Sequence, residues 1–116
     1  MVKSMGFNSL SVYIMWNYHE VKRGVFDYET ENKNLTLFLE LAKKLDLYVL
    51  IRPGPYVCAE WDFGGLPARF LVDPNLTIRS NTPIYLAETK VYFASLVPLL
   101  KPYLSSNGGP IVLLQI

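Results

Sequence analysis

The chain has 116 residues, the size of one small domain. Hydrophobic residues make up 51% of the sequence and charged residues 18%, a composition that buries a core and excludes a disordered tail. Eleven Lys and Arg residues nearly balance ten Asp and Glu residues, to a formal net charge of +1, and they are scattered along the chain. We therefore expect no nucleic-acid partner, because proteins that bind nucleic acids present clustered basic residues.

The first residues and the single cysteine narrow the class further. Residues 1–6 contain no apolar run and are not a signal peptide. No stretch reaches the roughly 18 to 20 apolar residues that a membrane span needs, so we expect no transmembrane segment. The only cysteine, Cys58, excludes an internal disulfide and a metal site built from thiolates alone. Two glycosylation sequons, at Asn34 and Asn75, give weak support for a secreted or lysosomal protein.

The first half of the chain predicts a strand, a helix and a second strand. Residues 8–15 are rich in β-forming side chains and predict a strand, which a polar stretch from 17 to 33 follows. Apolar residues at helical spacing then predict an amphipathic helix with one stripe: Leu35, Phe38, Leu41, Ala42 and Leu45. Residues 47–51 form a short, continuously apolar run, which is typical of a buried parallel strand.

The second half predicts a long loop, a helix and a third strand. The loop runs to about Asn81 and is rich in glycine and proline. Thr82-Pro83 predicts a helix start, since a hydroxyl residue at the N-cap followed by proline at the first helical position is a common beginning. We expect Pro98 to kink or end this helix. Residues 110–116 are a third apolar strand.

Apolar strands that alternate with amphipathic helices predict right-handed βαβ units and a parallel sheet. A doubly wound sheet and a (β/α)8 barrel both have this pattern. No Gly-rich phosphate-binding fingerprint follows any strand, so a dinucleotide cofactor is unsupported and we expect no cofactor. Polar and aromatic residues cluster just after the strands, where barrels build their active sites. We therefore predict an α/β fold, part of a (β/α)8 TIM barrel, with about three parallel strands and two connecting helices.

A complete barrel needs about 250 residues. Three strands and two helices cannot close one, and an open sheet exposes unpaired backbone and apolar surface at its edges. The last predicted strand also stops without its following loop. We therefore expect residues 1–116 to be an internal fragment of a catalytic barrel domain.

The first candidate cluster, residues 13–20, lies at the end of the first predicted strand. Packing of aromatic rings explains most of it and is the simpler interpretation of the single histidine, His19. His19 together with Glu20 and Cys58 suggests a metal site. However, no HExxH or CxxC spacing supports one, and we expect no metal.

The second cluster, residues 52–67, combines proline, glycine, aromatic and acidic residues at a density that a surface loop does not need unless its shape serves a purpose. Glu60 stands between Ala59 and Trp61. A carboxylate beside an aromatic ring suits a sugar, because it accepts charge-assisted hydrogen bonds from two hydroxyls, and the small Ala59 lets the backbone approach. A nucleophilic Cys58 is the competing hypothesis, but no cysteine-protease signature surrounds it.

Together with residues 108–116, these clusters resemble family 35 of the glycoside hydrolases. That family has a Tyr-x-x-Trp-Asn-x-His-Glu stretch, matched at residues 13–20. It also has an Arg-Pro-Gly-Pro-Tyr-x-Cys-Ala-Glu-Trp-x-x-Gly-Gly-Leu-Pro stretch, matched at 52–67, and Gly-Gly-Pro-Ile-x-x-x-Gln-Ile, matched at 108–116. The resemblance covers essentially the whole chain, and the middle motif is long enough to be highly specific.

The resemblance implies hydrolysis of terminal non-reducing β-D-galactose from β-galactosides by a retaining double displacement. The family's two catalytic glutamates would follow Ile116, so we expect no catalytic residue within this chain and no activity from it alone. By similarity, Tyr13 hydrogen-bonds the galactose through its hydroxyl. Cys58, Ala59 and Glu60 line the pocket floor, and Glu60 accepts from ring hydroxyls. The implied partner is a galactoside, free or in a glycoconjugate.

Three positions depart from the family pattern. Met15 and Val21 stand where proline is usual, which should only loosen a loop. Arg69 stands where tryptophan is usual, near the expected pocket rim, so it bears on the preferred leaving group or linkage. Two alternatives stay open: a catalytically inactive galactose-binding relative, and another retaining barrel glycosidase of the β-glucosidase or mannanase type. The resemblance also implies a secreted or lysosomal protein.

Overall fold

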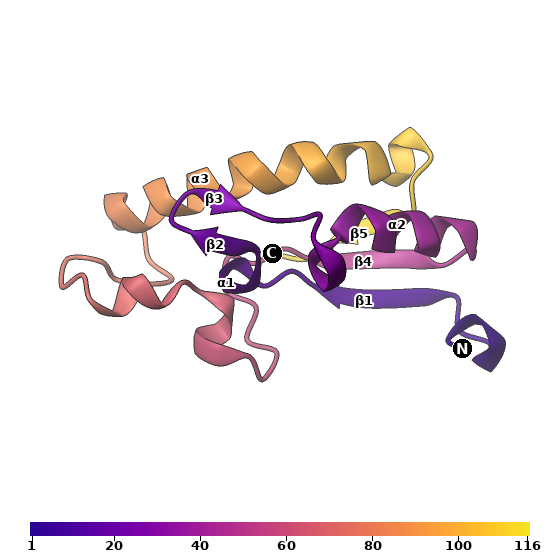
Figure 1. The fold of residues 1–116 in the computed structure, drawn as a ribbon, viewed down its shortest axis with the longest axis horizontal. Helices are drawn as coiled ribbons and strands as arrows, with labels where there is room; N and C mark the ends of the chain where they lie inside the picture. The colour runs from indigo at the N-terminus through magenta and orange to yellow at the C-terminus, as the bar shows by residue number, and fades with distance from the viewer.

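The structure is a computed structural model that describes residues 1–116. Its centre is a sheet of three parallel strands in the spatial order β1 (Ser9–Tyr13), β4 (Tyr48–Arg52) and β5 (Ile111–Leu114). Helix α2 (Leu35–Lys44) connects β1 to β4, and helix α3 (Pro83–Leu100) connects β4 to β5 (Figure 1). The prediction of an α/β chain with three parallel strands and two connecting helices is confirmed.

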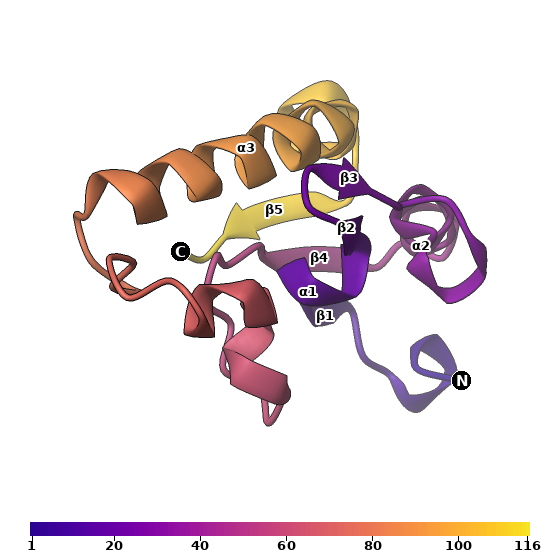
Figure 2. The ribbon, with the colours of Figure 1, turned by 60° about the vertical axis from the view of Figure 1, so that its left-hand side comes forward.

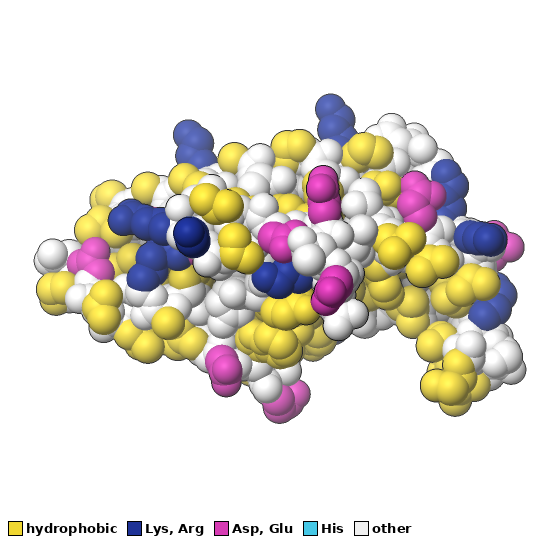
Figure 3. All heavy atoms as spheres, viewed as in Figure 1, with side chains coloured by type: hydrophobic (Ala, Val, Ile, Leu, Met, Phe, Trp, Pro, Cys, Tyr) yellow, Lys and Arg dark blue, Asp and Glu magenta, His cyan; other side chains and the backbone are white.

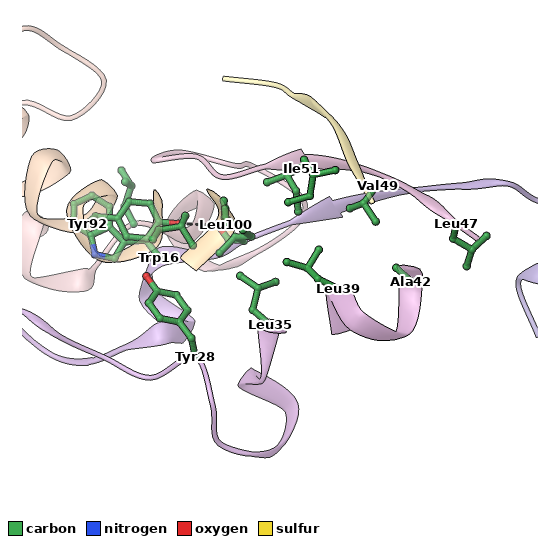
Figure 4. Close-up of a cluster of buried hydrophobic side chains, with 14 of the residues drawn as sticks. Trp16, Tyr28, Leu35, Leu39, Ala42, Leu47, Val49, Ile51, Tyr92 and Leu100 are labelled. Carbon is green, nitrogen blue, oxygen red and sulfur yellow. Dashed lines mark hydrogen bonds between the residues drawn. The ribbon is translucent and has the colours of Figure 1, made fainter. Parts of the chain in front are cut away.

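Both connecting helices cover the same face of the sheet (Figure 2). Val49 and Ile51 lie on this face together, because side chains two residues apart on a strand point the same way. Both are fully buried. They join Leu39 of α2 and Leu96 of α3 in one core of 16 buried residues, part of which Figure 4 shows. On the opposite face, Tyr48 is 57% exposed. The hydrophobic core therefore lies between the sheet and the two helices.

Asn34 caps the start of helix α2: its side-chain oxygen accepts a hydrogen bond from the Leu37 N–H at 2.8 Å. Its buried residues are Leu35, Leu39 and Ala42. The predicted apolar stripe is wrong in part: Phe38, Leu41 and Leu45 are exposed, and Leu39, which the stripe omitted, is fully buried. Apolar residues occupy more than one side of this helix, so the spacing fits two overlapping faces and only packing against the sheet selects one.

Helix α3 begins at Pro83, as predicted, but the Thr82 side chain does not cap it. The Thr82 hydroxyl instead donates to the carbonyl oxygen of Thr77 at 3.2 Å. We expected Pro98 to kink or to end the helix; it does not end it, because the helix continues to Leu100. Leu100 is 4% exposed, and its place in the core stabilises the turn after the proline. None of the helices is both long and apolar enough to cross a membrane.

The sequence suggested a simple loop for the polar stretch after β1, but the structure contains regular elements there. It contains a short helix α1 (Trp16–His19) and an antiparallel hairpin of β2 (Glu20–Lys22) and β3 (Val25–Phe26). Gly24, with a φ of +75°, allows the tight turn between these strands. The segment after β4 likewise holds two turns of 3-10 helix. Both segments lie at the carboxyl end of the sheet (Figure 1).

Stacked aromatic rings connect these two segments to helix α3. Trp16 is fully buried, with its ring 4.7 Å from that of Tyr92 in α3 and nearly parallel to it (Figure 4). The Tyr92 hydroxyl donates to the carbonyl oxygen of Pro53 at 2.8 Å. Burial raises the pKa of Tyr92, so this hydroxyl keeps its proton and donates at any physiological pH. Helix α3 is thereby joined to the start of the loop after β4.

Considerable apolar surface remains exposed outside the core (Figure 3). Val112, Leu113 and Leu114 of β5 are each 47% exposed, and Leu41 of α2 is 48% exposed. Strand β5 lies at one edge of the sheet and β1 at the other, so each has one side without a strand partner. Sheet edges of this kind favour pairing with further strands.

Candidate functional site

The carboxyl ends of the three parallel strands meet at a small cavity of about 100 Å3. Tyr13 ends β1 and Arg52 ends β4, and the two residues are partners in the sheet register. Gln115 directly follows β5, and its N–H donates to the carbonyl oxygen of Ile51 at 2.9 Å. Tyr13, Arg52 and Gln115 all line the cavity, as do Tyr56 and Ile116. The register of a parallel sheet brings these side chains together.

Arg52 orients the Tyr13 hydroxyl. Its Nη1 donates to the Tyr13 oxygen at 2.5 Å, and its guanidinium carbon lies 5.0 Å from the centre of the tyrosine ring. The phenol oxygen therefore acts as acceptor toward Arg52, and the Tyr13 O–H stays available to donate to another group. Arg52 was not predicted as a site residue. The available signal was its place as the charged residue that directly follows the apolar run of residues 47–51.

Cys58, Ala59 and Glu60 form a turn in which every φ angle is positive, at 62°, 54° and 48°. The Trp61 N–H closes this turn by donating to the Cys58 carbonyl oxygen at 3.0 Å. Residues with a side chain pay roughly 1–2 kcal/mol each for the left-handed conformation, and such turns usually contain Gly or Asn. Backbone strain of this kind persists where the surroundings impose it, and it clusters at functional sites.

Hydrogen bonds and one glycine impose the shape of this turn from the carboxyl side. The Gly64 N–H donates to the Trp61 carbonyl oxygen at 2.9 Å, and the Val57 N–H donates to the Gly64 carbonyl oxygen at 2.8 Å. Gly64 has a φ of +60°, and a Cβ atom there would lie 2.0 Å from the Tyr56 ring. Only glycine fits this position without moving the ring, so the loop closes tightly around Tyr56.

A second, larger cavity of about 560 Å3 lies between the β2–β3 hairpin and the loop after β4. Arg69 lines it, and its guanidinium binds the carboxylates of both Glu20 and Glu88; its hydrogen bond to Glu88 measures 2.6 Å. Burial opposes the charge of Glu88, but hydrogen bonds from Arg69 and Arg23 outweigh burial and hold the pKa of Glu88 below its usual value. Arg69 thus serves an ion-pair network and does not line the cavity around Tyr13.

His19 is buried among aromatic rings, as the simpler interpretation predicted. Its Nδ1 donates to the Asp27 carbonyl oxygen at 2.9 Å, and its ring centre lies 4.9 Å from that of Tyr28. Burial lowers the pKa of His19, which favours the neutral ring. Glu20 is engaged by Arg69, and Cys58 is exposed on its own turn. Nowhere do three or more His, Cys, Asp or Glu side chains gather as metal ligands would.

The sequence-predicted binding residues occupy two neighbouring places. Tyr13 lines the small cavity, whereas Cys58, Ala59 and Glu60 share the left-handed turn in the loop after the adjacent strand β4. Both places lie at the carboxyl end of the sheet (Figure 2). No hydrogen bond joins Tyr13 to the turn; its hydrogen bond goes to Arg52.

Comparison with known proteins gives one consistent result. The sequence model of the family described as Glycosyl hydrolases family 35 matches residues 1–116. A beta-galactosidase of Felis catus is 44% identical over 115 residues, which is 99% of this chain and 17% of the cat protein. The beta-galactosidase of Homo sapiens is 42% identical over the same shares.

A Mus musculus protein named beta-galactosidase-1-like protein is 40% identical over 111 residues, 96% of this chain and 17% of its own length. The chain therefore spans less than a fifth of the relatives it matches. The resemblance drawn from the three sequence motifs is confirmed. Because the family match extends over every residue, the chain belongs to glycosyl hydrolases family 35.

Proposed function

We propose that residues 1–116 are part of the catalytic barrel of a retaining β-galactosidase, which releases terminal non-reducing β-D-galactose from β-galactosides. The observation that carries this proposal is the exposed carboxylate of Glu60 on a strained left-handed turn, in a family 35 chain. Relatives named beta-galactosidase share 44% and 42% of the aligned residues, which supports the same activity here.

The topology supports a barrel. The strands follow one another in the order β1-β4-β5, and both connecting helices lie on one face, as in an arc of a (β/α)8 barrel. In a closed barrel, the face without helices turns inward, and Tyr13 and Arg52 would then point into the mouth at the carboxyl ends of the strands. Active sites of such barrels are built at this end.

In the proposed site, Tyr13 donates its hydroxyl proton to the galactose, and Glu60 accepts from two ring hydroxyls. The Glu60 carboxylate makes no hydrogen bond within the chain and is exposed, so both of its oxygens are free to accept. Bonds to a charged acceptor are roughly twice as strong as neutral ones. Cys58 and Ala59 form the floor in this proposal, because they share the left-handed turn with Glu60.

These residues bind and orient the sugar but do not cleave it. A retaining glycosidase needs two carboxylates about 5 to 5.5 Å apart, one as acid/base and one as nucleophile. We assign neither role to residues 1–116. Hydrogen bonds to ring hydroxyls can tighten as the ring distorts toward the transition state, so Glu60 and Tyr13 contribute to the rate as well as to binding. The reaction as proposed requires no cofactor or metal.

The variant Glu60→Gln in the full-length protein tests this proposal. It keeps the size of the side chain but removes the charge, so kcat/KM for an aryl β-galactoside should fall roughly 100-fold, or about 2.7 kcal/mol. Glu29→Gln is the matched control, because Glu29 is also exposed but lies in the segment after β3.

An unchanged kcat/KM in Glu60→Gln would remove Glu60 from the site. The wild-type protein should also be assayed with the matching aryl β-glucoside. Faster hydrolysis of the glucoside than of the galactoside would favour the β-glucosidase alternative. Galactose binding without turnover of either substrate would favour the inactive relative.

We also propose a secreted or lysosomal glycoprotein. Asn75 of the second sequon is exposed in the loop after β4, where a glycan has room. In the first sequon, the Asn34 side-chain oxygen caps α2, and its amide nitrogen makes no hydrogen bond within the chain. A glycan on either amide nitrogen would replace no hydrogen bond of the fold, so both sequons are compatible with modification in a secretory compartment.

A further inference from the structure

We propose that Asn17 is a positioning residue, which fixes the turn of Cys58–Glu60 by holding the two residues that follow it. This inference rests on the proposed function only in assigning the sugar to Glu60. Its structural part, that Asn17 keeps the turn in its left-handed shape, stands by itself.

The contacts of Asn17 join the segment after β1 to the loop after β4. Trp61 Nε1 donates to Asn17 Oδ1 at 2.9 Å. Asn17 Nδ2 donates in turn to the carbonyl oxygen of Asp62 at 3.2 Å. One amide side chain thus uses its acceptor on the side chain of Trp61 and its donor on the backbone of the next residue. These contacts span 44 and 45 residues of sequence, so they are tertiary links between two segments.

The turn needs such a link because it has few of its own. Its residues have side chains and adopt positive φ angles, and one bond, from the Trp61 N–H to the Cys58 carbonyl oxygen, closes it. The Glu60 side chain is exposed and has no partner in the chain. Trp61 therefore links the turn to Asn17: its backbone N–H closes the turn, and its indole N–H donates to the Asn17 side chain.

Asn17 itself is well placed to act as a fixed point. It lies in α1 between Trp16, which is fully buried in the core, and Tyr18, whose ring meets the Trp61 ring edge-on at 5.8 Å. The buried neighbour anchors the backbone of Asn17, and the aromatic contact limits the positions open to the indole. The rigid core therefore sets the position of Glu60 through Asn17 and Trp61.

Loss of this link should misplace Glu60 without removing it. Small errors in the position of a group that binds the reacting sugar reduce the rate substantially. In the full-length protein, Asn17→Ala should lower kcat/KM for an aryl β-galactoside roughly tenfold. Trp61→Phe puts a smaller aromatic ring in place of the indole and removes its N–H donor, but it leaves the bond from Asn17 to the Asp62 carbonyl oxygen, so its loss should be smaller. Asn107→Ala is the control: Asn107 is exposed and donates to the Lys101 carbonyl oxygen at 2.8 Å, but it precedes β5 at the other end of the sheet.

A double-mutant cycle with Glu60→Gln separates positioning from general stability. If Asn17 acts through Glu60, the double variant should be no slower than Glu60→Gln alone, because the group being positioned is already impaired. Additive losses would overturn the proposal, and so would an Asn17→Ala protein with unchanged kcat/KM beside a slow Glu60→Gln.

Amide hydrogen exchange supplies a readout that does not depend on activity. The Trp61 and Gly64 amides, which bond within the loop, should exchange faster in Asn17→Ala than in wild type and Asn107→Ala. Faster exchange throughout the protein would overturn the positioning role. An unchanged exchange rate at these two amides would overturn it as well. If Glu60→Gln leaves activity intact while these two amides still respond to Asn17→Ala, the assignment of the sugar to Glu60 fails and the role of Asn17 in the turn survives.

Discussion

The core beneath helices α2 and α3 and the loop after β4 are held in place by different forces. In the core, Trp16 and Tyr92 are fully buried and stacked, and shape is set by packing of large rings. In the loop, Glu60 and Trp61 are exposed, and shape is set by backbone hydrogen bonds and the room left by Gly64. Burial therefore holds the core together, whereas hydrogen bonds and the close fit of Gly64 give the turn of Cys58–Glu60 its form.

The two regions meet at several points, and Leu66 and Phe70 of the loop are themselves buried in the core. The Tyr92 hydroxyl bonds to the Pro53 carbonyl oxygen at the start of the loop, and Asn17 bonds to Trp61 in its middle. Variants of residues buried in the core should change stability most, and variants in and around the exposed turn of Cys58–Glu60 should change activity more than stability. The three predictions that follow test this division in the full-length protein.

Trp16→Ala should have the largest effect. It removes a fully buried ring that stacks on Tyr92 and meets Phe70 edge-on at 5.3 Å, so the free energy of unfolding should fall by about 3–5 kcal/mol. Trp16→Phe keeps a ring and should lose clearly less; the indole Nε1 has no hydrogen-bond partner, so its removal breaks no bond. Denaturant unfolding gives both values. A loss below about 1 kcal/mol in Trp16→Ala would contradict the account of the core.

Gly64→Ala should have an intermediate effect on stability and a clear effect on activity. The new Cβ would meet the Tyr56 ring, so we expect a loss of about 1–3 kcal/mol from overpacking in addition to backbone strain. Gly24→Ala is the matched control. Its φ of +75° brings similar strain, of about 1 kcal/mol, but no atom lies within 4 Å of the added Cβ.

Unfolding midpoints and kcat/KM should be measured for both glycine variants. Only Gly64→Ala should slow galactoside hydrolysis, since only Gly64 bonds to the residues around the Glu60 turn. Equal losses in the two variants would mean that left-handed strain alone matters and that the fit around Tyr56 does not.

Glu88→Gln should have the smallest effect, and one that depends on pH. Arg69 and Arg23 hold the pKa of Glu88 below its usual 4.5 despite burial, so the folded state favours the charged form. This stabilisation is present above that value and is lost as the pH falls below it. The wild-type protein should therefore lose more stability on acidification than Glu88→Gln, by about 0.5–1 kcal/mol, since Arg23 is largely exposed. Thermal unfolding on both sides of pH 4.5 measures this; identical acid sensitivity would contradict the ion-pair network.

Much of the fold follows from the sequence because its signals are local. The apolar run of residues 47–51 and the Thr82-Pro83 pair mark a strand and a helix start that the structure contains at nearly the same positions. The β2–β3 hairpin was missed because its strands have only three and two residues, too few to show a periodic pattern. The buried face of α2 was mistaken because apolar residues on several sides leave the choice to tertiary packing.

The candidate site was predictable in composition but not in geometry. The sequence motifs pointed to Tyr13 and to Cys58–Glu60, but no local rule predicts positive φ angles at three residues that are neither Gly nor Asn. Arg52 and Asn17 were not singled out because their roles come from partners 39 to 45 residues away, Tyr13, Trp61 and Asp62. Contacts of that range depend on the sheet register and loop closure, which single-sequence patterns do not encode.

A structure of the full-length protein with bound galactose tests the central claim most directly. We predict that the Tyr13 hydroxyl and the Glu60 carboxylate both lie within hydrogen-bond distance, about 2.5–3.2 Å, of hydroxyls on one galactose ring. A galactose bound elsewhere, or one that contacts Tyr13 while Glu60 points away from it, would contradict the account.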